Sequence, residues 1–176
     1  MNTIAVDAMG GDSAPIDIVK GAIKAKEQGV DVVLCGDKNL INPYLENHEI
    51  PVFDFPQVIS MDEDPLKAIR NKKNASIVGC MQLLKDKKVQ AVFSAGSTGA
   101  TLISAISILG KHKGVIRPVI ASVLPSLSGN TILLDSGASL DVKPKVLFQY
   151  GIMGAKLAEV IMAVSYTHLR AHETLL

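Results

Sequence analysis

A short run of small and polar residues, Ser94 to Gly99, offers the groups needed to bind an anion. It follows an apolar, β-prone segment and precedes an apolar run compatible with a helix, so the sequence predicts strand, turn and helix. Backbone N–H groups at the start of such a helix are unpaired, and the helix dipole favours negative charge there. Gly96 and Gly99 allow close approach to the backbone, and the hydroxyls of Ser97 and Thr98 add donors. The pattern indicates a phosphate-binding turn, with a capped helix start that binds nothing as the alternative.

Two further turns of this kind follow predicted strands, at residues 7–13 and 135–141. In an α/β sheet, ligands bind beyond the carboxyl ends of the strands. We therefore expect the three turns to line one crevice for an anion or a small molecule. The candidate binding residues in these turns are Gly10, Gly11, Asp12, Gly96, Ser97, Thr98, Gly99, Asp135, Gly137 and Ser139.

The cationic candidates for the same crevice are Arg70, Lys72, Lys73 and Arg117. Lys72 lies near the end of a predicted helix, and Arg117 precedes an apolar run at 119–124. An ammonium or guanidinium group would neutralise phosphate, although a solvated helix end is the alternative for Arg70, Lys72 and Lys73. The aspartates of the turns would repel a phosphate, so we expect them to orient the backbone or a basic partner.

The elements that position these turns alternate along the chain. The predicted strands are residues 3–6, 30–35, 50–53, 89–93, 119–124 and 131–134. Helical segments separate most of them, with Asp12 or Ser13 expected to cap the first helix and Pro15 in its first turn. This order predicts an α/β fold with a mostly parallel sheet.

The composition narrows the class of protein. The chain has 176 residues, 48% hydrophobic and 20% charged, which is typical of a folded globular protein. A net charge of +1 and the absence of Trp give no basis for nucleic-acid binding. Cys35 and Cys80 lack metal-ligand spacing, so we expect buried thiols in a reducing, cytoplasmic compartment. We expect neither a metal nor a cofactor. The first segment does not resemble a signal peptide, and the longest apolar run is too short to span a bilayer.

Five motifs, in order, carry a family resemblance. They are Asp7-Ala8-Met9-Gly10-Gly11-Asp12 with Ala14-Pro15; Asp64-Pro65 with Ala68-Ile69-Arg70 and Lys72-Lys73; Ser94-Ala95-Gly96 with Thr98-Gly99-Ala100; Arg117-Pro118; and Leu134-Asp135 with Gly137-Ala138 and Asp141. Together they resemble the phosphate acyltransferase (PlsX) family of bacterial phospholipid synthesis. Each motif is weak alone, but their shared order is specific.

The resemblance implies a fold, a reaction and partners. The fold would be three-layer α/β, similar to phosphotransacetylases and to the isocitrate and isopropylmalate dehydrogenases. The reaction would move an acyl group from acyl carrier protein to inorganic phosphate. Family members are homodimers, and some are thought to touch membranes through their C-terminal half. The alternatives are a phosphotransacetylase acting on coenzyme A thioesters, and an inactive fragment or binding module.

The chain departs from the family in three respects. Ser97 and Ser139 stand where the family usually has Asn, which shortens the side chain and removes an amide donor. The resemblance covers residues 1–163, about the N-terminal half of a family member. Residues 164–176 resemble translated sequencing adapter, so we expect a non-native tail there.

Overall fold

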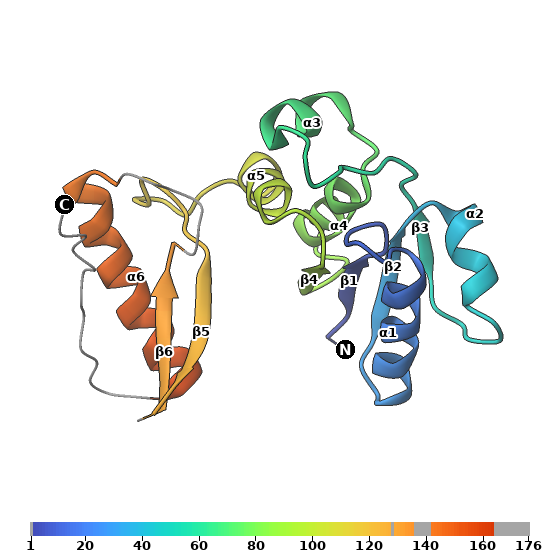
Figure 1. Cartoon of the computed structure of the whole chain (residues 1–176), viewed down its shortest axis with the longest axis horizontal. Helices are drawn as coiled ribbons and strands as arrows, with labels where there is room; N and C mark the ends of the chain where they lie inside the picture. The colour runs from blue at the N-terminus through green and yellow to red at the C-terminus, as the bar shows by residue number, and fades with distance from the viewer. Residues whose placement is uncertain (1, 128, 136–141, 164–176) are drawn as a thin grey trace. The chain divides into compact units, whose positions relative to one another are not determined.

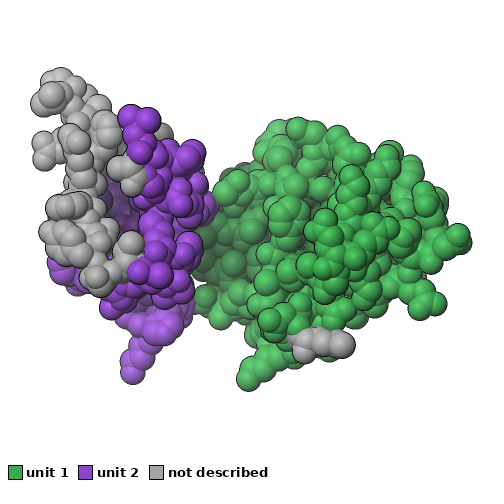
Figure 2. All heavy atoms as spheres, turned by 90° about the horizontal axis from the view of Figure 1, so that it is seen from below, with its two compact units in different colours: residues 1–110 green, residues 111–176 purple. Residues whose placement is uncertain are grey.

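The computed structural model describes residues 2–127, 129–135 and 142–163, which form two compact units, residues 1–110 and 111–176 (Figure 2). Its elements follow the predicted order (Figure 1). The first unit contains β1 (Ile4–Asp7), α1 (Ile16–Glu27), β2 (Val32–Gly36), α2 (Lys38–Ile41), a 3-10 turn (Asn42–Tyr44), β3 (Val52–Asp54), α3 (Pro65–Asn71), α4 (Ser76–Lys85), β4 (Ala91–Ser94) and α5 (Thr98–Ile108). The second contains β5 (Ala121–Ser126), β6 (Gly129–Leu134) and α6 (Pro144–Met162). The expected tail, residues 164–176, lies outside the described residues.

The first unit is built on a four-stranded sheet with the order β3-β2-β1-β4. All its neighbouring strands are parallel, which confirms the predicted mostly parallel sheet. β1 pairs with both β2 and β4, and Asp7 at its end lies opposite Cys35 and Ser94. The carboxyl ends of β1 and β4 therefore meet at one edge of the sheet.

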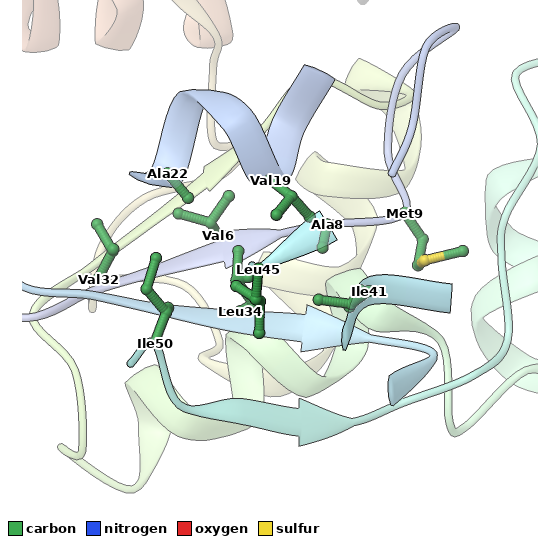
Figure 3. Packing of buried hydrophobic residues seen from close by; sticks show 10 residues of the cluster. All are labelled: Val6, Ala8, Met9, Val19, Ala22, Val32, Leu34, Ile41, Leu45 and Ile50. Atoms are coloured by element: carbon green, nitrogen blue, oxygen red, sulfur yellow. The ribbon is translucent and has the colours of Figure 1, made fainter. Parts of the chain in front are cut away.

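Alternate side chains of the strands enter two different cores, so the sheet is covered on both faces. Val6 and Leu34 pack on one face with Val19 of α1 and Ile41 of α2 (Figure 3). On the other face, the residues in between pack against α4; they are Ala5, Val33 and Cys35, which meet Cys80 and Leu83. Helix, sheet and helix thus form three layers in this unit.

The two cysteines lie in the second of these cores. Both are buried and free, which confirms the expectation of buried thiols. The neighbouring Cys35 side chain and burial raise the pKa of the Cys80 thiol well above its usual range. Cys80 is therefore an unreactive apolar group at neutral pH.

Side-chain caps mark the starts of α2, α3 and α5. Asp37 accepts hydrogen bonds from the N–H groups at the start of α2, and Asp64 accepts one from Lys67 N at the start of α3. The predicted cap of α1 is wrong, because neither Asp12 nor Ser13 caps it through its side chain. The chain turns once more before the helix, and the Ser13 carbonyl accepts the Asp17 N–H instead.

The second unit is a hairpin with one helix. β5 and β6 pair antiparallel from Ala121 opposite Leu134 to Ser126 opposite Gly129, and α6 packs on β6. Gly154 faces the Leu134 side chain, which allows this close packing. Over the described residues, no helix is both long enough and apolar enough to cross a membrane.

Alanine substitutions at two helical glycines, Gly79 in α4 and Gly21 in α1, test the packing around α4. A Cβ at Gly79 would overlap the Phe55 ring, whereas a Cβ at Gly21 on α1 would meet nothing within 4 Å. We expect Gly79→Ala to lower the free energy of unfolding by about 1–3 kcal/mol through overpacking. Gly21→Ala, the matched control, should raise it by about 0.5–1 kcal/mol. Urea denaturation measures both, and equal stabilisation by the two variants would contradict the packing.

Candidate anion site at the edge of the parallel sheet

A buried carboxylate joins the ends of β1 and β4. Asp7 is 3% exposed, and its Oδ2 accepts a hydrogen bond from Ser94 Oγ at 2.6 Å. Its Oδ1 accepts from Met9 N at 3.3 Å. Ser94 Oγ in turn accepts from Gly96 N at 3.1 Å. Because a buried carboxylate needs hydrogen-bond donors, this network fixes the two turns that leave the strands.

Two glycines bring the turns into direct contact. A Cβ at Gly10 would lie 2.5 Å from Asp7 Oδ2 and 2.9 Å from Gly96 N, and one at Gly96 would lie 3.1 Å from Gly10 Cα. Gly11 has φ +111° and packs against Ala95. The structure thus brings together the predicted turns at 7–13 and 94–99, and glycine is required because the backbones touch.

A small hollow opens beside this contact. It is lined by Asp7, Met9, Gly10, Ile59, Ser76, Ile77, Ser94, Gly96, Ser97, Ala100 and Thr101. Its centre has about 10 Å³ of free space, room for a single water molecule. Of the described residues that line it, none is basic, and Asp7 is the one ionisable group.

The start of α5 forms one wall of the hollow. Ser97 is the N-cap residue, and its Oγ accepts from Ala100 N at 3.3 Å. The cap leaves the Ser97 hydroxyl proton available as a donor. The N–H groups of Thr98 and Gly99 donate no hydrogen bond within the described part of the chain. Capping and anion binding are thus compatible at this helix start.

The remaining candidate residues of the first unit do not line the hollow. Asp12 and Thr98 are exposed, and Gly99 packs against Pro65, so none of the three lines the hollow. Lys72 also lies outside the lining, because its Nζ donates to Val58 O at 2.7 Å and to Glu63 Oε1.

The predicted third turn belongs to the second unit. Asp135 has φ +64°, and its Oδ2 accepts from Tyr150 Oη at 3.5 Å. Its buried Oδ1 makes no hydrogen bond within the described part of the chain. Arg117 lies in the same unit, whereas Gly137 and Ser139 lie outside the described residues. A crevice shared by all three turns stays a prediction.

Ala100 and Thr101 line the hollow just beyond the predicted turn at 94–99, and three further lining residues come from elements with no predicted site residue. Ser76 and Ile77 open α4, and Ile59 lies in the loop after β3. No glycine-rich turn marks them, and Ser76 stands in an ordinary helix-start pattern. The one available signal was its place after Asn74-Ala75, at the start of an apolar helical run.

The fold is that of a phosphotransacetylase-like α/β protein. It is similar to the EutD phosphotransacetylase from Staphylococcus aureus, with a TM-score of 0.59 and 18% identity, over 89% of this chain and 52% of that one. At this identity the likeness shows the fold alone.

Sequence relatives then define the family. The family profile described as "Fatty acid synthesis protein" matches residues 2–170. A phosphate acyltransferase of Desulforamulus reducens is 44% identical over 99% of this chain and 55% of its own length. One from Desulfitobacterium hafniense is 45% identical over 93% of this chain and 50% of its own. The chain belongs to this fatty acid synthesis protein family, which confirms the resemblance to phosphate acyltransferases, and it spans about half the length of these relatives.

A double-mutant cycle tests the Asp7 network. Ser94→Ala removes the donor to Asp7 and the acceptor of Gly96 N–H, and Asp7→Asn removes the charge and replaces one of the two acceptor oxygens with a donor. Each variant should lower the free energy of unfolding by about 1–3 kcal/mol. The free energy of unfolding of the double variant should fall by less than the sum of the two single losses, because both changes break one network. The difference should be about 0.5–3 kcal/mol. Additive losses in urea denaturation would contradict the coupling.

The ion pair between Lys72 and Glu63 makes the stability of the fold depend on pH. The hydrogen bond from Lys72, helped by Ser60 N–H, lowers the pKa of Glu63 below its usual 4.5. Ionised Glu63 therefore stabilises the fold above pH 4.5, and this contribution is lost as the pH falls through the folded-state pKa. The stability difference between the unsubstituted chain and Glu63→Gln should shrink below pH 4.5. A constant difference between pH 3 and 6 in urea denaturation would contradict this role.

Proposed function

We propose that this chain is part of an enzyme that moves a fatty acyl group from acyl carrier protein to inorganic phosphate. The product, acyl phosphate, would feed phospholipid synthesis. Family membership and relatives named phosphate acyltransferase support this proposal. The observation that carries it is the start of α5, where the N–H groups of Thr98 and Gly99 have no partner in the described part of the chain, beside a hollow.

The proposed reaction needs positioned donors more than a strong base. A phosphate oxygen attacks the thioester carbonyl carbon, the new C–O bond forms, the C–S bond breaks, and the thiolate leaves and takes up a proton. Phosphate is already an anion at neutral pH, so the protein must orient it and stabilise the oxyanion. The α5 N–H groups and the Ser97 hydroxyl are the donors that we assign to phosphate.

Asp7 has an orienting role in this proposal. Its two oxygens accept from Ser94 Oγ and Met9 N, so it holds the turns and contacts no anion. The hollow has room for one water molecule, and a bound phosphate would therefore have to widen it. Ile59 lies in the long loop between β3 and α3, and we assign the widening to this loop.

The finer parts of the proposal concern assembly and location. Residues 1–163 would form the N-terminal part of the acyltransferase domain, in a homodimer in the cytoplasm. Acyl carrier protein would bring the thioester, and peripheral membrane contact would involve a C-terminal half like that of the longer relatives. Phosphate binding by Arg117, Asp135, Gly137, Ser139 and Lys72 also stays a proposal.

Two specific observations favour alternatives. The fold likeness to a phosphotransacetylase supports an enzyme acting on coenzyme A thioesters. Exposed apolar side chains on α6, including Phe148 at 70% and Val160 at 81%, support a chain that is inactive by itself.

Thioester choice tests the proposed reaction. We expect acyl phosphate to form from long-chain acyl-carrier protein and phosphate, and no turnover of acetyl-coenzyme A. The assay uses this chain and, in parallel, this chain joined to the remaining C-terminal part of the Desulforamulus reducens relative. Turnover of acetyl-coenzyme A alone would favour the phosphotransacetylase alternative. Activity of the joined chain alone would show that 176 residues are not sufficient.

A further inference from the structure

The helix α4 begins at the same hollow as α5. Its first two residues, Ser76 and Ile77, line the hollow, and no side chain caps it. Ser76 N–H donates to Gln57 O at 3.0 Å. The N–H groups of Ile77 and Val78 donate no hydrogen bond to any described residue. This helix of ten residues therefore presents free donors at its positive end.

The Ser76 side chain is a second, independent sign of a ligand. Ser76 is 3% exposed, yet its hydroxyl makes no hydrogen bond with any described part of the chain. Among the described residues, Asp135 Oδ1 is the one side-chain polar atom that is fully enclosed without a partner, so the Ser76 oxygen keeps an open side, and it can accept or donate a hydrogen bond there. Its position in the wall of the hollow gives it access to a bound molecule.

The two helix starts approach the hollow from different elements. α5 contributes Ser97 to the lining, and α4 contributes Ser76 and Ile77. The N–H groups of Thr98 and Gly99 follow Ser97 directly in the chain but lie outside the lining. The described lining has no basic side chain, so an anion there depends on hydroxyl and N–H donors. A tetrahedral oxyanion has oxygens in several directions, and donors from two helices suit it better than donors from one.

We propose that α4 supplies the second half of the phosphate cradle, through the Ser76 hydroxyl and the N–H groups of Ile77 and Val78. The inference rests on the proposed function, and it names inorganic phosphate as the occupant. A phosphate group carried by phosphopantetheine shares this chemistry and is the rival source.

The experiment is a titration of the ¹⁵N-labelled chain with inorganic phosphate, followed by NMR, with phosphopantetheine in parallel. We expect the amide signals of Ile77 and Val78 to shift together with those of Thr98 and Gly99. Ser76→Ala should weaken phosphate binding about tenfold, as expected for a hydrogen bond to a charged group. Ser76→Asp should abolish binding, because a carboxylate repels phosphate, and the melting temperature of each variant shows whether it is folded.

Two matched variants complete the design. Ser104→Ala removes an equally buried helical hydroxyl, which donates to Thr101 O, and should leave phosphate affinity unchanged. Thr98→Pro removes one α5 N–H at a position where proline fits a helix, and it tests the proposed function by itself.

The outcomes separate the two proposals. Weaker binding in Thr98→Pro with full affinity in Ser76→Asp, or static Ile77 and Val78 signals, would overturn the α4 cradle alone. Absence of phosphate binding by the unsubstituted chain would overturn both proposals. Binding of phosphopantetheine without inorganic phosphate would overturn inorganic phosphate as the occupant.

Discussion

The hydrogen bond between the Asp7 carboxylate and the Ser94 hydroxyl underlies the candidate site. It joins the last residues of β1 and β4, which lie opposite each other, and Asp7 is buried. A buried carboxylate without donors would be strongly unfavourable, so the strand ends must stay paired. The same hydroxyl accepts the Gly96 N–H, which sets the direction of the turn into α5. The position of the α5 donors thus depends on one interaction between two strands.

Much of the fold could be predicted because its signals are local. Glycines and hydroxyls after apolar β-prone runs marked the turns at 7–13 and 94–99, and Asp64 before Pro65 marked the start of α3. The predicted cap of α1 was wrong because the choice between a side-chain and a carbonyl acceptor depends on the conformation of the preceding turn. Lys72 was ambiguous, because a cation at a helix end suits a phosphate and an ion pair equally. Its partner Glu63 lies in the loop between β3 and α3, and the sequence of that loop has no periodic pattern that would predict the ion pair.

The other missed residues came to the hollow through tertiary packing. Ser76 and Ile59 are separated by a loop and α3, and no spacing in the sequence relates them to Gly10. An anion site without a basic side chain is also hard to recognise from composition, because its donors are backbone groups. Such a site depends on the orientation of helices, and for α4 and α5 this depends in turn on the cores at Cys80 and at Ile77.

The Asp7–Ser94 pair has a further consequence for how β4 finds its place. β4 is an edge strand that pairs with β1 alone, and edge strands are the most prone to slip in register. A shift by one residue would set Phe93 or Ala95 opposite Asp7, and neither offers a hydroxyl donor. The misaligned sheet would bury an unpaired carboxylate and would be disfavoured during folding. The residues that organise the candidate site therefore also select the correct alignment of the strand that carries it.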